Sequence, residues 1–180
     1  MRTAALASAA ALLASTALAQ SEPAYIPMEQ APASVMTQTD CDDAGPGGEV
    51  MINEAFGAVV FRVRCAGNNA NYVQALIFAD DRAGRNARLI RFPDGDPGAP
   101  ATEISNVRLF PAARAIGSID VDTEDGLAIN GVCRSERLWR LAGERPTLVW
   151  WRTNGDCEGA GRWRVRLDRR TRAERRLAWS

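Results

Sequence analysis

The chain has 180 residues, with 22 basic and 22 acidic side chains and a formal net charge of zero at neutral pH. Every basic residue is an arginine, because the sequence contains neither histidine nor lysine. These absences exclude the Ser-His-Asp triad, the Cys-His dyad, the Ser-Lys pair, the Schiff-base lysine and all imidazole metal ligands. The balanced charge gives no reason to expect nucleic acid or an acidic membrane as a partner.

The first 19 residues have the pattern of a secretory signal peptide. Arg2 supplies positive charge, residues 4–18 form a short apolar run, and residues 17–19 offer small side chains for cleavage before Gln20. The run is shorter than the ~20 apolar residues that a bilayer requires, so no membrane span is expected. We therefore expect an exported protein, located in the periplasm or secreted.

The remainder of the chain is long enough for one domain with a core of its own. Residues 20–40 carry three prolines and little apolar periodicity, which indicates an extended or disordered lead-in. A β-rich domain is expected over residues 41–168. Residues 169–180 are rich in arginine, and we expect them to form a solvated basic tail.

Short apolar runs separated by Gly, Pro, Asn and Asp clusters predict an all-β fold. We expect a small antiparallel sheet or sandwich of about eight short strands built from hairpins. In chain order the predicted strands are residues 58–64, 72–79, 87–92, 104–110, 116–121, 138–141, 147–152 and 162–167. Residues 72–79 and 87–92 should form one hairpin, and residues 138–141 and 147–152 another.

Four cysteines lie in the predicted domain, at Cys41, Cys65, Cys133 and Cys157. An even number in an exported protein is typical of disulfides, and three pairings are conceivable. The equal separations favour two local bridges, Cys41 with Cys65 and Cys133 with Cys157. The second pair also lies near the open end of the predicted 138–152 hairpin. No C-x-x-C spacing and no histidine support a zinc site, so no metal or other cofactor is expected.

Residues 72–167 resemble a family of secreted Gram-negative bacterial proteins known as domain of unknown function 1176. The resemblance lies in Phe78 and Asp80, then Gly84, then the run Arg91-Phe92-Pro93-Asp94-Gly95, and finally Cys133, Trp139, Leu148-Val149 and Cys157. Cys41 and Cys65 lie outside it. The resemblance implies an exported β-rich protein and supplies no catalytic residue.

Carboxylate chemistry remains open to this composition, and the densest acidic cluster is Asp120, Asp122, Glu124 and Asp125. Paired carboxylates could serve as acid and base in glycan hydrolysis. A calcium site is a second interpretation, although the spacing departs from that of an EF-hand loop. The simplest interpretation is a solvated turn at the end of a strand.

Tryptophans could supply a stacking platform for a sugar or a peptide. Trp150 and Trp151 are adjacent on a predicted strand, so their side chains must point to opposite faces of the sheet. One should lie in the core. Trp151, if exposed beside Arg152, would be a binding candidate, although burial is favoured.

Two functional hypotheses follow. The preferred one is a non-enzymatic envelope module that binds a protein, a peptide or a glycan, without nucleic acid, a membrane span or a catalytic residue. The other is a carboxylate-dependent hydrolase, or a calcium site, at residues 120–125.

Overall fold

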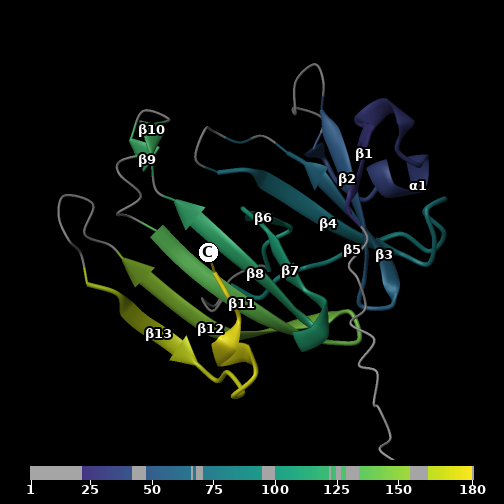
Figure 1. Cartoon of the computed structure of the whole chain (residues 1–180). Helices are drawn as coiled ribbons and strands as arrows, with labels where there is room; N and C mark the ends of the chain where they lie inside the picture. Colours follow the sequence, from purple (N-terminus) through teal and green to yellow (C-terminus); the bar gives the residue numbers. More distant parts are fainter. Residues whose placement is uncertain are drawn as a thin grey trace, which may run out of the picture.

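The computed structural model describes residues 22–41, 48–65, 67, 71–94, 100–121, 123–124, 127–128, 134–154 and 162–179. These residues form two antiparallel sheets of six and five strands and a separate pair of short strands (Figure 1). The predicted all-β class is therefore confirmed. The strands are more numerous than expected, since two N-terminal strands and the separate pair of short strands were not predicted, and one predicted strand is divided between the sheets.

The first sheet has the order β1-β2-β3-β4-β5, and β6 also pairs with β4. Its strands are β1 (Ala24–Pro27), β2 (Glu49–Ala55), β3 (Ala58–Arg64), β4 (Val73–Ala79), β5 (Arg88–Leu89) and β6 (Glu103–Ser105). The β2–β3 hairpin turns on Phe56 and Gly57, both with positive φ. Such a two-residue turn matches the right-handed twist of the flanking strands. The predicted β4–β5 hairpin is confirmed.

The second sheet has the order β13-β12-β11-β8-β7. Its strands are β7 (Arg108–Phe110), β8 (Ala115–Val121), β11 (Arg134–Ala142), β12 (Arg145–Asn154) and β13 (Arg164–Asp168). A 3-10 turn, η3 (Pro111–Ala113), joins β7 to β8, and β9 (Thr123–Glu124) pairs with β10 (Leu127–Ala128). The predicted β11–β12 hairpin is confirmed.

Asn106 explains why the predicted strand 104–110 is two strands. Its φ of 46° places it in the left-handed region, which asparagine tolerates better than most residues. The chain therefore leaves the first sheet after β6 and enters the second sheet at β7. The side-chain oxygen of Asn106 accepts a hydrogen bond from the Tyr72 backbone N–H at 3.0 Å, which fixes the crossing point.

The two sheets pack against a shared apolar core. From the first sheet it takes Val60, Leu76 and Phe78, and from the second Ile116, Trp139, Leu141 and Leu148. Two further clusters cover the outer faces, so β4 is buried on both sides and its sequence is almost continuously apolar.

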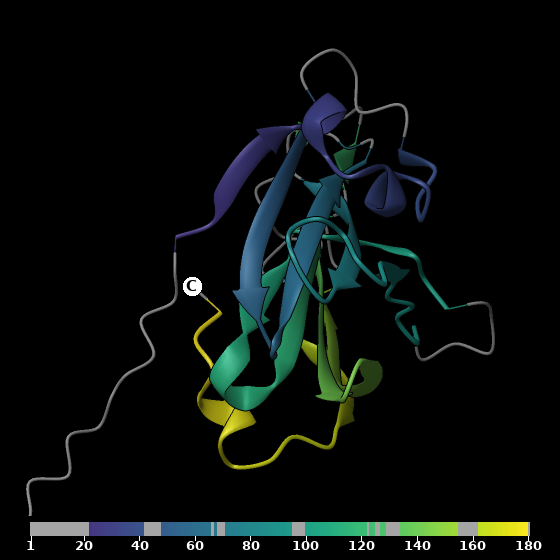
Figure 2. The ribbon, with the colours of Figure 1, turned by 90° about the vertical axis from the view of Figure 1, so that its right-hand side faces the viewer.

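The outer face of the first sheet is covered by the N-terminal segment, which differs from the expected extended or disordered lead-in. After β1 the chain forms η1 (Met28–Gln30) and the helix α1 (Ala33–Met36), at the top of Figure 2. Val35 of α1 is buried, and the Ser34 hydroxyl donates to the Gly84 carbonyl at 2.9 Å. The prolines did not prevent packing because Pro32 stands just before the helix, where proline is tolerated. In the described ranges no helix is long and apolar enough to cross a membrane.

The predicted bridge between Cys41 and Cys65 is confirmed, with a Cα–Cα distance of 4.5 Å. It ties the end of the N-terminal segment to the end of β3. A loop of this length stabilises the fold by about 3 kcal/mol in the chain-entropy model. Cys133 and Cys157 lie outside the described residues, so their pairing stays a prediction. The β11–β12 ladder ends with Arg134 opposite Asn154, close in sequence to both.

The C-terminal segment packs on the outer face of the second sheet, whereas a solvated tail was expected. It forms η4 (Glu174–Arg176), whose first residue exchanges two hydrogen bonds with Thr171 in the manner of a capping box. The Glu174 N–H donates to the Thr171 hydroxyl at 3.3 Å, and the Glu174 carboxylate accepts from the Thr171 N–H at 2.6 Å. Beyond η4, the Trp179 ring lies 4.9 Å from the Trp150 ring, between centroids. In the sequence, this Thr-x-x-Glu pattern lies in an arginine-rich stretch and was not recognised as the start of a helical turn.

Acid should weaken this C-terminal packing. The Arg140 guanidinium donates to both carboxylate oxygens of Glu174, at 2.6 and 2.7 Å, and lowers its pKa to about 2 from 4.5. Because the folded pKa lies below the unfolded one, the stabilisation is complete above about pH 5 and is lost as the pH falls through about 2. Urea unfolding from about pH 7 to 2 should therefore show a smaller loss of stability for Glu174→Gln than for the wild type. An unchanged slope in the variant would contradict this assignment.

Candidate functional site

A cavity with polar and apolar lining lies beside β7, the edge strand of the second sheet, over strands of the first sheet. Its volume is about 610 Å³, within the range typical of ligand sites. We call it the Arg62 pocket. Its lining residues are Tyr25, Met51, Arg62, Tyr72, Gln74, Asn106, Val107, Arg108 and Ile119.

Strand register brings three of these side chains into one row. Tyr25 of β1 is opposite Met51 of β2, and Met51 is opposite Arg62 of β3. Gln74 of β4 is opposite Arg64, two residues from Arg62, so it projects from the same face. That face carries the shared core at its other end. The pocket is thus the uncovered continuation of the core-facing side of the first sheet.

Arg62 is held by acceptors that carry no charge. Its Nε and Nη2 atoms donate to Gln74 Oε1 at 3.2 and 2.7 Å, and Nη2 also donates to the Val107 carbonyl at 3.0 Å. Nη1 contacts the Met51 sulfur at 3.1 Å, a weak acceptor. Among the described residues no carboxylate forms an ion pair with Arg62. Burial lowers the pKa of Arg62, but an arginine remains charged at neutral pH.

Gln74 is 1% exposed, and its amide nitrogen donates no hydrogen bond to the described residues. Its Oε1 accepts from Arg62, which fixes the orientation of the amide because a guanidinium has only donors. The Nε2 atom is buried and has no hydrogen-bond partner in the described part of the chain. A buried donor left unsatisfied costs about 1–3 kcal/mol, so its retention requires an explanation.

Aromatic rings and a rigid wall complete the pocket. The Tyr25 side chain is 56% exposed on the edge strand β1, and the Arg64 guanidinium stacks 4.6 Å from the centre of the Tyr72 ring. Behind Tyr72, Asn71 exchanges hydrogen bonds with the backbone of Val121 at 2.6 and 2.8 Å. Asn106 donates to the Ile119 carbonyl at 2.9 Å. These amides tie β8 to the pocket wall.

The predicted carboxylate cluster is only partly described. Asp120 is exposed near the end of β8 and lines a second, smaller cavity of about 170 Å³ with Asp94 and Glu103. Asp94 is already paired, because its carboxylate lies 2.9 Å from Arg137 Nε. Glu124 belongs to β9, whose backbone alone is described, and Asp122 and Asp125 lie outside the described residues.

Trp150 and Trp151 point to opposite faces of β12, as predicted. Trp150 is buried on the outer face under the C-terminal segment, and Trp151 is half-buried against the shared core. The Trp151 indole N–H donates to the Ser135 hydroxyl at 3.1 Å. Arg152 pairs with Glu136 at 2.6 Å and stacks 4.0 Å from the Trp163 ring centre. Arg152 is therefore occupied within the protein.

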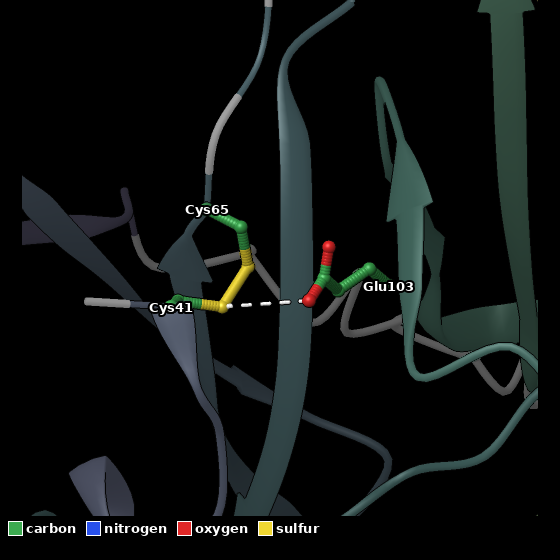
Figure 3. Close-up of side chains that lie close together, drawn as sticks. All are labelled: Cys41, Cys65 and Glu103. Carbon is green, nitrogen blue, oxygen red and sulfur yellow. Dashed lines mark hydrogen bonds between the residues drawn. A yellow bond between two sulfur atoms is a disulfide. The ribbon is translucent and has the colours of Figure 1, made fainter. Parts of the chain in front are cut away.

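Glu103 and the disulfide form a third group of side chains. Figure 3 shows the Glu103 carboxylate directed at the bridge, with Oε1 4.0 Å from Cys41 Sγ. The Thr39 hydroxyl lies 2.7 Å from the same sulfur. Ligand atoms of Cys41, Cys65 and Glu103 lie within 4.8 Å of one another, a spacing that a metal ion could use. A bridged sulfur is not a thiolate ligand, so the oxidised protein has no metal site here.

The residues of the Arg62 pocket were not singled out from the sequence. The available signal was a polar residue inside an apolar strand, Arg62 after Val59-Val60-Phe61 and Gln74 before Ala75-Leu76-Ile77. Polar groups that interrupt a buried strand are costly unless they are paired or functional.

Comparisons with known proteins give no relative for this chain: no family model, curated protein or solved structure matches it.

Proposed function

We propose that this chain is an exported, non-enzymatic binding module of the bacterial envelope, and that the Arg62 pocket is where it binds a protein, peptide or glycan ligand. Export is supported by the charged, apolar and small-residue order of residues 1–19 and by a disulfide in the described part of the chain.

One observation carries the binding proposal: a charged guanidinium without an ionic partner in the described residues lines an open cavity with two tyrosine rings. Ligand sites combine apolar and aromatic lining with a few directed polar groups. Catalysis by acid and base needs a titratable pair, and the residues that line this cavity include no carboxylate.

A carboxylate-dependent hydrolase is the second candidate, because Asp120 lines a cavity with two other acidic residues. The support is weaker. The cavity is less than a third of the size of the Arg62 pocket, and the ion pair with Arg137 occupies Asp94.

The test begins with the full chain expressed in a Gram-negative host and purified from the periplasm. Its intact mass should correspond to a start at Gln20 and to two disulfide bridges. The purified protein is then screened on peptide and glycan arrays beside Tyr25→Ala, with Val165→Ala as the matched control. Both side chains are exposed to a similar extent, 56% and 59%, and only Tyr25 lines the pocket.

We expect the ligands found on the arrays to bind Tyr25→Ala about tenfold more weakly than the wild type, since an aromatic contact contributes on the order of 1 kcal/mol. Their affinity for Val165→Ala should be unchanged. The pocket would be rejected as the binding site if no array ligand binds, or if the affinity of the ligands that bind is the same for Tyr25→Ala and the wild type.

A further inference from the structure

Two polar side chains on neighbouring strands, Arg62 and Gln74, line the Arg62 pocket. Arg62 Nη1 on β3 faces only the Met51 sulfur among the described residues, and Gln74 Nε2 on β4 has no partner among them. Both groups are held in place, because Gln74 Oε1 accepts from Nε and Nη2 of the same arginine. The pocket therefore contains a fixed guanidinium for which the described residues supply no anion.

A carboxylate supplies the anionic partner that the described residues do not give Arg62. It is planar, carries one negative charge and offers two oxygens that accept hydrogen bonds from parallel donors. Charge-assisted hydrogen bonds of this kind are shorter and stronger than neutral ones. The remaining lining combines Met51, Val107, Ile119 and the tyrosine rings with the polar side chains of Asn106 and Arg108, so the ligand should carry an apolar or aromatic group beside its carboxylate.

We propose that the Arg62 pocket recognises a carboxylate group of its ligand, with the Arg62 guanidinium pairing with that carboxylate and Gln74 holding the guanidinium in place. Tyr25, Tyr72 and Val107 contact its apolar body. This inference rests on the proposed function, since it names the chemistry that the same pocket selects.

The decisive variant is Gln74→Glu. It has nearly the same shape as the wild type and places a carboxylate beside Arg62, where it supplies the missing partner from within the protein. The variant should fold, with a melting temperature equal to or above that of the wild type, and it should no longer accept an external carboxylate. Arg62→Met removes the donor itself, and Arg91→Met is the control, an exposed arginine outside the pocket lining.

The probes are 3-phenylpropionate, its neutral amide and phenyl phosphate, titrated calorimetrically into the oxidised mature protein at low chloride. We expect 3-phenylpropionate to bind the wild type at least about tenfold more tightly than its amide. Affinity should fall at least about tenfold in Gln74→Glu and in Arg62→Met, and should change less than about twofold in Arg91→Met.

Several outcomes would overturn the inference: equal binding of the amide, tighter binding of phenyl phosphate, undiminished binding by Gln74→Glu, or no binding of 3-phenylpropionate below about 10 mM. The array screen separates the two proposals. If array ligands depend on Tyr25 and the acid does not bind, only the carboxylate assignment fails. If neither probe set binds, the pocket is not a ligand site.

Discussion

Replacing Trp139 by alanine is expected to lower the free energy of unfolding by about 3–5 kcal/mol. Trp139 is 1% exposed in the core that the two sheets share, opposite Ile116 of β8 and Leu148 of β12. Its ring packs against Phe92 with centroids 5.0 Å apart, and its indole N–H donates to the Pro93 carbonyl at 2.7 Å. Truncation would open a cavity between the sheets and remove the donor from that carbonyl. Urea unfolding measures the change.

Two controls separate packing from the hydrogen bond. Trp139→Phe keeps an aromatic ring beside Phe92 and loses the indole donor, so it should cost only about 1–2 kcal/mol. Val165→Ala removes an exposed apolar side chain and should change stability by less than about 0.5 kcal/mol. A loss below about 1 kcal/mol in Trp139→Ala would contradict a core shared by both sheets.

The strands that were predicted correctly are those in which the apolar pattern and the turn residues indicate the same boundaries. Residues 58–64 were predicted with the bounds of β3, and the β4–β5 and β11–β12 hairpins follow from Asp, Gly and Pro turns. β2 was missed because its turn uses Phe56 with Gly57, and phenylalanine is not a usual residue at positive φ. β1 was missed because Pro23 just before it and Pro27 at its end indicate an open chain, whereas an edge strand tolerates proline.

The site was harder to predict than the fold because it depends on register. The acidic cluster around Asp120 and the pair Trp151 and Arg152 attract attention by composition alone. Whether Arg62 has an ionic partner depends on which side chains β1, β2 and β4 bring beside it, and that is a property of strand pairing. Gln74 offered no signal beyond a single amide in an apolar strand.

Glu136→Gln is expected to lower the free energy of unfolding by about 3–5 kcal/mol, although it changes only the charge of the side chain. Glu136 is 0% exposed on β11, on the outer face of the second sheet. Its Oε1 lies 2.7 Å from Arg134 Nη2, and its Oε2 lies 2.6 Å from Arg152 Nη2. The neutral amide would leave two neighbouring guanidinium groups without their shared anion.

The ring of Trp163 makes that change more costly, because it holds both arginines in place. Arg134 and Arg152 stack on it, 4.9 and 4.0 Å from its centre, so neither turns freely to solvent. Losing one arginine should therefore cost less than losing the shared anion. We expect the urea midpoints to fall in the order Glu136→Gln, then Arg152→Met, then Arg134→Met, with the largest decrease first. An Arg134→Met variant as unstable as Glu136→Gln would show that the carboxylate is not the shared centre of this group.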